Sequence, residues 1–196
     1  MSFYTFDHFL SSNLAVDAKV IARLTQSCQR LSLKKGEFAL RVGERCRHSF
    51  YIEKGLLKEY TVDDKGKEHI LLFAPEHCFA ANIETVHFSR PADYFMEALE
   101  DTQVLLLDQH LIDQLGEEFE SFRAFNEKLL HQHIQELQHR VTQLLGASAR
   151  DRYLDFVERY PHLTVRLSQV QIAAYLGITP EGLSRVRREL AQQAQR

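Results

Sequence analysis

The segment LSQVQIAAYLGITPEGLSRVRREL, residues 167–190, constrains the fold of this 196-residue chain most strongly. Ser168, with Gln171 three positions later, fits a capping box at the start of a first helix. Gly177 can end that helix because glycine adopts a left-handed backbone without strain. The dipeptide Thr179-Pro180 then supplies an N-cap and a first helical residue for a second helix. The segment therefore predicts a helix-turn-helix with a three-residue turn.

The second predicted helix separates apolar from polar residues. Leu183, Val186 and Leu190 recur on one side at helical spacing, which predicts a buried stripe. The opposite side carries glutamate and arginine, whose side chains can bond to base edges in the major groove of DNA. An ordinary helical hairpin with a solvated basic face is the alternative interpretation. The residues expected to contact DNA are Ser168, Gln169, Thr179, Pro180, Glu181, Ser184, Arg185, Arg187 and Arg188.

This stretch resembles the DNA-binding motif of the Crp/Fnr family of bacterial transcription regulators, and the similarity covers nearly the whole chain. In that family the recognition helix commonly begins Arg-Glu and carries an arginine four residues after the glutamate. The matching residues here are Pro180, Glu181 and Arg185. Because proline replaces one expected arginine, the resemblance implies DNA binding but leaves the target sequence open. It also implies three partners: double-stranded DNA with an inverted-repeat site, a second copy of the chain, and RNA polymerase.

The length and composition fit a folded protein of two domains. A chain of 196 residues can form two modest cores, and 44% hydrophobic with 26% charged residues is ordinary for a globular protein. No apolar run suggests a membrane span, and the first ten residues lack the basic and apolar regions of a secretory signal. We therefore expect a cytoplasmic protein without a membrane partner.

The charge is unevenly distributed along the chain. From Ala147 onward, eight arginines and five acidic residues give a net charge of +3. The rest of the chain carries −6, so the total is −3. A basic end on an acidic body would orient the molecule toward a polyanion. Arginines on helix faces are also often only solvated. The charge distribution therefore favours a nucleic-acid partner without requiring one.

Cys28, Cys46 and Cys78 are odd in number and widely spaced, which argues against a disulfide framework or a cysteine metal site. Buried thiols are the simplest interpretation. The oxygen-sensing branch of the family holds an iron-sulfur cluster on closely grouped cysteines, and this chain lacks such a group. We expect no metal and no cofactor.

Short strands separated by glycine-containing turns are predicted from about Leu31, after short helical turns over residues 1 to about 20. Asp63-Asp64-Lys65-Gly66 has the composition of a hairpin turn, and the regular spacing suggests a barrel or jelly roll. With Tyr51-Ile52 before Gly55, the pattern resembles the family's cyclic-nucleotide-binding β-roll, and residues 97–102 match one of its later strands. The turn glycines are Gly36, Gly43, Gly55 and Gly66.

The effector pocket of that roll departs from the family pattern. In cyclic-nucleotide-binding members, a Phe-Gly-Glu sequence supplies backbone amides and a ribose-binding carboxylate, and a nearby arginine pairs with the cyclic phosphate. Here alanines replace the glycine and the glutamate, and Pro91 or Ala92 takes the place of the arginine. Nearby Arg90 and free backbone amides leave another way to bind phosphate. The expected degenerate pocket consists of Phe79, Ala80, Ala81, Asn82, Arg90, Pro91 and Ala92.

Metal and enzyme interpretations lack a ligand set. Isolated histidines on strands and loops are more often structural, and a cupin-like enzyme would need an HxH motif with a nearby glutamate on its strands. The only HxH motif, His131 with His133, falls in a predicted helix. No nucleophile-base pair emerges from the spacing, so we do not expect an enzyme. The cluster considered and set aside is His69, His77, Cys78 and His87.

The longest helical pattern runs from about Glu117 to about Leu145. Its aliphatic residues recur at alternating intervals of 4 and 3, which implies a partner helix. Phe119, Phe122 and Phe125 extend the apolar surface and are accounted for by packing on the chain's own roll. By the resemblance, this helix forms the dimer, with a hinge at residues 146–148. The predicted dimer seam is Leu130, Ile134, Leu137, Val141 and Leu144.

These features predict an α+β fold with three parts: a double-stranded β-helix, or jelly roll, with N-terminal helical turns (residues 1–116), a long dimerisation helix (117–146) and an all-α, winged-helix-like helix-turn-helix (147–196). The link between Tyr160 and Leu167 leaves little room for the usual β-hairpin wing, so a reduced wing is expected. The predicted function is a dimeric, sequence-specific transcription regulator of Crp/Fnr type. The alternative is a dimeric sensory or scaffold protein that no longer recognises DNA.

Overall fold

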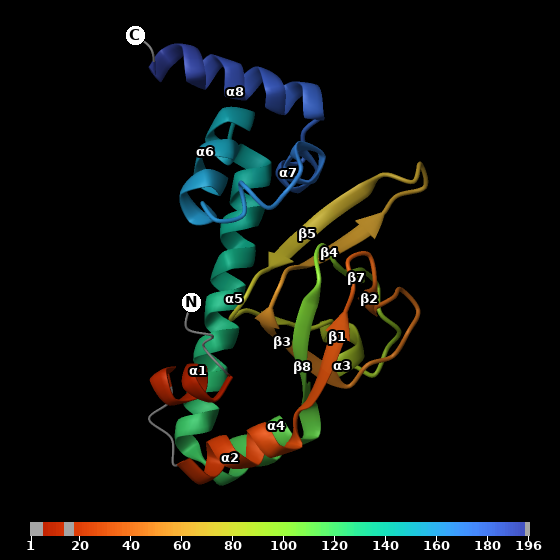
Figure 1. Ribbon diagram of the computed structural model, residues 1–196, viewed down its shortest axis with the longest axis vertical. Helices are drawn as coiled ribbons and strands as arrows, with labels where there is room; N and C mark the ends of the chain where they lie inside the picture. Colours follow the sequence, from red (N-terminus) through yellow and green to blue (C-terminus); the bar gives the residue numbers. More distant parts are fainter. Residues whose placement is uncertain (1–5, 14–17, 195–196) are drawn as a thin grey trace. The chain divides into compact units, whose positions relative to one another are not determined.

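The computed structural model describes residues 6–13 and 18–194. These residues form two compact units. The first extends to Thr61 and includes Leu71–Leu130, and the second combines Val62–Ile70 with the chain from His131 onward. Figure 1 follows the chain through the strands of the first unit and along the long helix α5 (Glu120–Gly146), which has residues in both units.

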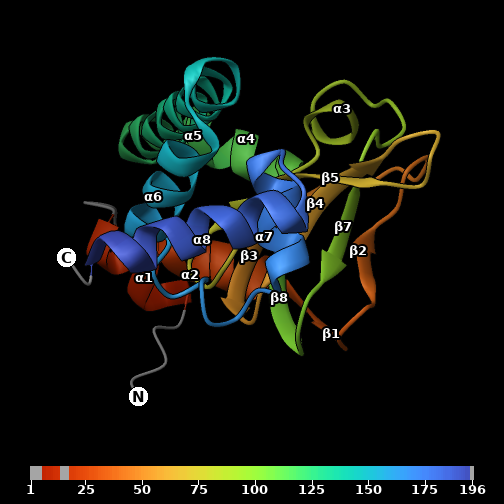
Figure 2. The same ribbon diagram turned by 90° about the horizontal axis from the view of Figure 1, so that it is seen from above.

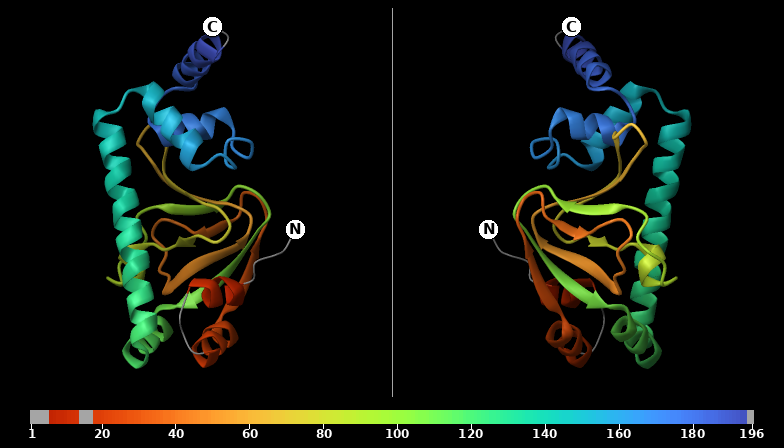
Figure 3. Two further views of the ribbon diagram at one scale, coloured as in Figure 1. Left: turned by 90° about the vertical axis from the view of Figure 1, so that its left-hand side faces the viewer. Right: turned by 90° about the vertical axis from the view of Figure 1, so that its right-hand side faces the viewer.

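The strands form a jelly roll of two four-stranded sheets, as the sequence predicts. One sheet has the order β1 (Gln29–Leu33), β8 (Thr102–Asp108), β3 (His48–Lys54) and β6 (Phe79–Ala80). The other has the order β2 (Phe38–Leu40), β7 (Phe95–Ala98), β4 (Leu57–Val62) and β5 (Glu68–Ala74). β8 pairs antiparallel with both β1 and β3, and β7 with both β2 and β4. Figure 3 shows the strands curling around a common interior from two opposite sides.

The apolar run in β8 is continuous because both faces of its sheet are covered. Alternate side chains of a strand point to opposite faces. Val104 packs into the interior of the roll with Phe50 and Ile52, whereas Leu105 and Leu107 belong to a second core on the other face. A strand covered on one face only would alternate apolar with polar residues.

The second core lies between this sheet and helices that flank the roll in sequence. α1 (Phe6–Asn13) and α2 (Ala18–Ser27) contribute to it, and the fully buried Tyr51 stands against them. The ring of Tyr51 lies 4.7 Å from that of Phe6 and 5.2 Å from that of Phe9. Tilted aromatic contacts of this kind add to the stabilisation from burial.

The N-terminal helical segment is longer than predicted. It continues to Ser27, and the first strand begins at Gln29 rather than near Leu31. Val20 and Leu24 are buried in the second core, which explains why this stretch is a helix with one apolar face. The remainder of the predicted helical turns, residues 1–5 and 14–17, lies outside the described residues.

The turns of the roll follow the predicted chemistry. In the β4–β5 hairpin the Asp63 carboxylate accepts hydrogen bonds from the backbone N–H groups of Lys65 and Lys67, at 2.9 and 3.0 Å. Gly55, between β3 and β4, has a φ of +97° and no room for a side chain, since a Cβ there would lie 2.5 Å from Thr102 Oγ1. Space as well as backbone conformation therefore requires glycine at this position.

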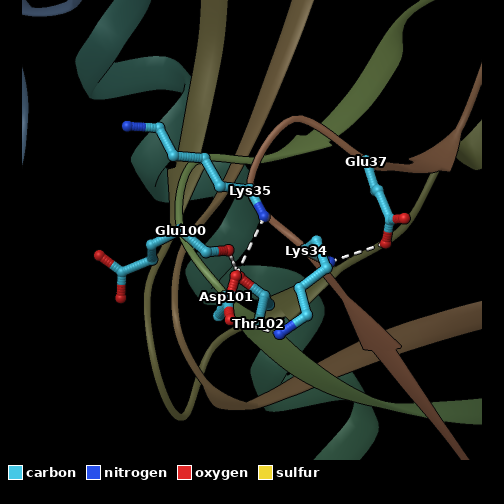
Figure 4. A network of polar contacts seen from close by, with 6 residues as sticks. All are labelled: Lys34, Lys35, Glu37, Glu100, Asp101 and Thr102. Carbon is cyan, nitrogen blue, oxygen red and sulfur yellow. Dashed lines mark hydrogen bonds and ion pairs between the residues drawn. The ribbon is translucent and has the colours of Figure 1, made fainter.

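Residues 97–102, predicted as part of one strand, instead cross a turn between β7 and β8. Asp101 in this turn accepts hydrogen bonds from Lys34 Nζ at 2.7 Å and from the Lys35 N–H at 3.3 Å (Figure 4). The strand prediction was wrong because the chain reverses at residues 99–101, where Asp101 bonds to the neighbouring β1–β2 turn.

The helix predicted for residues 117–146 begins at Glu120 in the structure. A separate helix precedes it, which the sequence pattern did not distinguish from it. α4 (Gln109–Glu118) ends at Phe119, whose backbone is extended with φ −128° and ψ 110°, and α5 starts at Glu120. Phe119 packs against the second core beside the buried Phe122. The phenylalanines therefore pack within the first unit as predicted. The helical backbone is interrupted at Phe119, the first of the three.

The second unit is helical from His131 onward. Its helices are α6 (Ala149–Arg159), α7 (Gln169–Leu176) and α8 (Pro180–Ala194), and Figure 2 shows α7 and α8 meeting at a tight turn. Phe156, Leu163 and Leu183 are fully buried between them. Residues 161–166 form turns, and no strand occurs between residues 109 and 194, so this part of the chain has no β-hairpin wing.

Glu59 is a buried acid inside the roll. It lies on β4 opposite Met96, a residue of the interior core, and only 5% of it is exposed. Burial raises the pKa of its carboxyl from an ordinary 4.5 to about 8, because desolvation disfavours the charged form. No described residue forms a hydrogen bond or ion pair with this carboxyl. The folded protein therefore keeps a proton that the unfolded chain releases.

We expect the free energy of unfolding to fall between about pH 5 and about pH 8 because of this residue. Because the pKa of Glu59 is raised in the folded protein, its contribution to the free energy of unfolding is complete below the pKa of the unfolded chain. This contribution is lost as the pH rises through the pKa of the folded state. Glu59→Gln should flatten this part of the curve and stabilise the protein at about pH 8 by an amount on the order of 1–3 kcal/mol. Urea unfolding at both pH values tests this, with the exposed Glu117→Gln as control. An unchanged slope in Glu59→Gln would contradict the assignment.

Candidate nucleic-acid interface and effector pocket

The helix-turn-helix has the caps that its sequence predicts. At the start of α7, Ser168 Oγ accepts from the Gln171 N–H at 3.2 Å, and Gln171 Oε1 accepts from the Ser168 N–H at 2.8 Å. α7 ends at Gly177, which is left-handed with φ +66°. At the start of α8, Thr179 Oγ1 accepts from the Gly182 N–H at 3.1 Å. A left-handed glycine thus ends α7 and a side-chain cap begins α8 at the two ends of the three-residue turn.

α8 buries one side and exposes the other. Leu183 and Val186 are buried and Leu190 is partly buried, as the stripe predicts. The helix continues to Ala194, four residues beyond its expected end. In the described chain no side-chain partner is found for its three arginines, so their guanidinium groups are available to bases or phosphates. The exposed side consists of Glu181, Ser184, Arg185, Arg187 and Arg188.

The other residues expected at the DNA are exposed at the starts of the two helices. These are Ser168, Gln169, Thr179 and Pro180. The hydroxyls of Ser168 and Thr179 are engaged in caps, and proline has no side-chain donor. The side-chain amide of Gln169, in the first turn of α7, has no hydrogen-bond partner within the described residues. Its amide and the positive end of the helix favour an anion at this place.

Arg140 of α5 positions the helix-turn-helix in the second unit. Its Nη2 donates to the Tyr175 carbonyl at 2.7 Å and to the Ile70 carbonyl at 2.9 Å, and its guanidinium lies 3.6 Å from the centre of the Tyr175 ring. Burial lowers the pKa of Arg140, although the two carbonyls and the ring stabilise its charge. A cation near the last carbonyls of α7 also complements the negative end of that helix. Sequence analysis missed this residue because arginines in a long polar helix are usually solvated.

The predicted seam residues lie exposed along α5. Their exposed fractions range from 41% for Leu144 to 54% for Leu130. Leu145, outside the seam, is still more exposed. Neither α5 nor any other helix in the described chain is long and apolar enough to cross a membrane. The surface is therefore an apolar stripe on a helix whose other sides are polar.

The residues of the expected effector pocket are used in packing and capping. Ala80 and Ala92 are buried in the interior core, and Phe79 packs against Tyr51 with ring centres 5.2 Å apart. Ala80 lies in β6 without a positive φ. Phe79 and Ala80, where the resemblance implies a phosphate-binding turn, form the short strand β6.

Asn82 and Tyr94 complete this region. Asn82 is buried, accepts from the Thr85 N–H as the N-cap of α3 (Ile83–Val86), and donates to Asp93 at 2.9 Å. The Tyr94 hydroxyl donates to the Ala81 carbonyl at 2.7 Å. The N-cap could have been found from the sequence, because asparagine is a preferred helix cap, whereas nothing in the pattern singles out Tyr94.

Arg90 and Pro91 are exposed beside this region. Arg90 pairs with Glu84 at 3.1 Å, and its side chain is 68% exposed. An arginine that already has a carboxylate partner and lies in solvent gives little support to phosphate binding. The alternative phosphate donor considered from the sequence is therefore occupied in this structure.

The cysteines and the histidines near the pocket are dispersed. All three cysteines are free and partly buried, so the expectation of buried thiols holds only in part. Burial raises the pKa of Cys28 to about 11, which keeps that thiol protonated near neutral pH. His69 contacts Asp63, and His77 contacts the Tyr51 hydroxyl. In the part of the chain that the structure describes, no three potential ligands meet at one point.

Comparison with known proteins finds similarity to a domain family and to transcription regulators. Residues 30–119 match the cyclic nucleotide-binding domain. The chain is 27% identical over 167 residues to the transcriptional activator protein anr of Pseudomonas aeruginosa, covering 79% of this chain and 67% of that protein. It is 24% identical over 168 residues to the fumarate and nitrate reduction regulatory protein of Vibrio cholerae, covering 79% and 65%. The matched part thus spans about two thirds of these relatives.

A solved structure shares the fold. FixK2 from Bradyrhizobium japonicum superposes with a TM-score of 0.75 at 17% identity, covering 85% of this chain and 86% of that one. The likeness extends over the jelly roll, the long helix and the C-terminal helices together, because the coverage exceeds the extent of either unit. With its nucleotide-binding-type roll, its long helix and a capped helix-turn-helix, the chain is similar to transcription regulators of the Crp/Fnr family.

Proposed function

We propose that this protein is a homodimer that recognises an inverted-repeat DNA site with α8 and thereby regulates transcription by RNA polymerase. The observation that carries the proposal is the exposed side of α8, where three arginines have no partner in the described chain. Glu181 and Arg185 lie in its N-terminal half, where glutamate can accept from cytosine and arginine can bond guanine bidentately. Arg187 and Arg188 lie further along and are suited to phosphates.

The dimer part of the proposal is supported by the stripe on α5. Five aliphatic side chains at heptad spacing are each at least 41% exposed, and water penalises such a surface. A second copy of α5 offers the same surface with matching spacing. Pairing along α5 would hold two α8 helices about one DNA turn, roughly 34 Å, apart.

The roll would serve as the sensory part, with a ligand other than a cyclic nucleotide. Three observations support this: Phe79 and Ala80 form β6 where the resemblance implies a phosphate turn, Ala81 has no ribose acceptor, and the exposed Arg90 is paired with Glu84. The proposal therefore assigns no known effector to the degenerate pocket.

A dimeric sensory or scaffold protein that no longer recognises DNA is the alternative. Two observations favour it: Pro180 stands where the family commonly has arginine, and the described C-terminal unit has no wing strands. Both functions require the dimer, so only DNA binding separates them.

We expect Arg185→Ala to weaken binding to a site selected by the wild type by about 1–3 kcal/mol and to flatten the preference at one base pair per half-site. Arg188→Ala should lower the affinity for all DNA sequences alike and reduce the salt dependence of binding, because it would remove a phosphate contact. Fluorescence anisotropy over a range of salt concentrations measures both, with the exposed Gln192→Ala as control. If Arg185→Ala kept both affinity and preference, α8 would not be the recognition helix.

Leu137→Glu should shift the protein toward monomer at micromolar concentration, because it places a charge in the middle of an apolar seam. Analytical ultracentrifugation measures the shift, and Gln138→Glu adds the same charge beside the seam as a control. A wild-type protein that sediments as a monomer would refute the seam.

Neither cyclic AMP nor cyclic GMP should bind tightly, since the pocket supplies no ribose acceptor and no unpaired arginine. Isothermal titration calorimetry with each nucleotide tests this directly. A submicromolar Kd for either would mean that Arg90 leaves Glu84 to bind phosphate, and the pocket would then be functional.

A further inference from the structure

Arg140 joins two backbone segments that lie far apart in the sequence. It lies in α5 and donates from Nη2 to the Ile70 carbonyl of β5 at 2.9 Å and to the Tyr175 carbonyl of α7 at 2.7 Å. All three residues belong to the second unit. One guanidinium therefore bridges the β4–β5 hairpin and the helix-turn-helix.

The Tyr175 carbonyl belongs to the last turn of α7, whose carbonyls have no partner within the helix. The N–H groups of Gly177 and Ile178 satisfy the carbonyls of the two residues before Tyr175. Arg140 satisfies the Tyr175 carbonyl and also lies 3.6 Å from the centre of its ring. Its charge is thus placed at the negative end of the helix, where a cation is stabilised. Arg140 completes the cap of α7 directly before the turn that leads to α8.

The Ile70 carbonyl belongs to a strand at the edge of its sheet. β5 is the last strand in the order β2, β7, β4, β5, so polar groups on its free edge need partners from outside the sheet. Ile70 is buried, and Arg140 donates to its carbonyl. β5 continues from Ile70 to Ala74, which packs in the interior core of the roll. A single strand thus runs from the core of the roll to the residue that Arg140 binds.

We propose that Arg140 couples the β4–β5 hairpin to the helix-turn-helix, so that a change in the hairpin alters how firmly α7 is held. No carboxylate pairs with Arg140 in the described residues, so its charge depends on the two carbonyls and the Tyr175 ring. Losing either carbonyl would leave a partly buried donor unsatisfied, which is costly. The hairpin and α7 therefore stabilise each other, because a coupling between two sites is reciprocal.

Arg140 would act on DNA binding as a positioning residue, and this consequence rests on the proposed function. Tyr175 lies just before the left-handed Gly177, and the three-residue turn there leads directly into α8. Ala74 of β5 lies in the core of the roll, the part proposed to be sensory. A change in that core would therefore reach α8 through β5 and Arg140. It would change the affinity for DNA without changing the preferred bases.

Hydrogen exchange of the full chain without DNA, followed by mass spectrometry, tests the coupling. Asp63→Ala removes the carboxylate that accepts from the Lys65 and Lys67 N–H groups, and so loosens the hairpin at its turn. We expect amides at the end of α7, in residues 173–178, to exchange at least about threefold faster in this variant. Asp101→Ala loosens the β7–β8 turn in the same way and should leave these amides unchanged.

An Arg140→Met background shows whether the effect passes through Arg140. Methionine fills similar space without a donor, so exchange should rise about tenfold in the hairpin and at the end of α7, as expected for loss of charge-assisted bonds. Asp63→Ala should then add nothing at α7. Arg123→Met, on the same helix and paired with Glu120, is the control.

Three results would overturn the coupling: an unchanged α7 in Asp63→Ala, equal effects of Asp63→Ala and Asp101→Ala, or additive effects of Asp63→Ala and Arg140→Met. If Arg140→Met lost its helical circular dichroism, the comparison of the two aspartate variants would still decide.

Fluorescence anisotropy with the selected inverted repeat measures the consequence for DNA. Arg140→Met should lower the affinity at least about tenfold while the preferred bases stay the same. A changed base preference would contradict the positioning role. A wild type that binds no DNA would overturn the proposed function but not the coupling, which hydrogen exchange decides alone.

Discussion

The apolar stripe on α5 is the constraint on which the proposed assembly depends. The phenylalanines at the start of the helix pack in the second core, but the aliphatic seam residues from Leu130 to Leu144 each remain at least 41% exposed in the described chain. A stripe with heptad spacing is best satisfied by an identical stripe, which produces a two-fold dimer. Two-fold symmetry in turn dictates an inverted repeat in the DNA. In the proposed function, dimerisation and DNA recognition would therefore be linked through one helix.

In the proposed function, contacts within the second unit hold α8 in place for DNA recognition. Arg140 contacts the backbone carbonyl and the aromatic ring of Tyr175 near the end of α7. The capping box and Gly177 fix the two ends of α7. α8 is then anchored by Leu183 and Val186 with its arginines outward. Recognition residues on a helix held in this way are more precisely placed than residues on a loop. The exposed charges of α8 are thus the product of buried contacts elsewhere in the unit.

Much of the fold was predictable, because local chemistry dictated it. The capping box, the left-handed Gly177 and the Asp63 turn each depend on residues close in sequence, and the structure has all three. Features that depend on distant contacts were missed: the break at Phe119 follows from packing on the second core, and the turn before Thr102 follows from its bonds to the β1–β2 loop. The contacts of Arg140 with Ile70 and Tyr175 were missed for the same reason. For the candidate site, helical periodicity predicted the exposed side of α8. The packing and capping contacts of the expected pocket residues could be seen only in the structure.

Changing the spacing between half-sites tests the central claim most directly. The measurement is the affinity of the wild-type protein for its selected inverted repeat and for the same repeat with five base pairs inserted at the centre. The insertion turns one half-site to the opposite face of the DNA, about half a helical turn away. If two α8 helices are held together through α5, affinity should fall at least about tenfold toward that of a single half-site. Equal affinity for both DNAs would contradict the account, because it would mean that the two half-sites are bound independently.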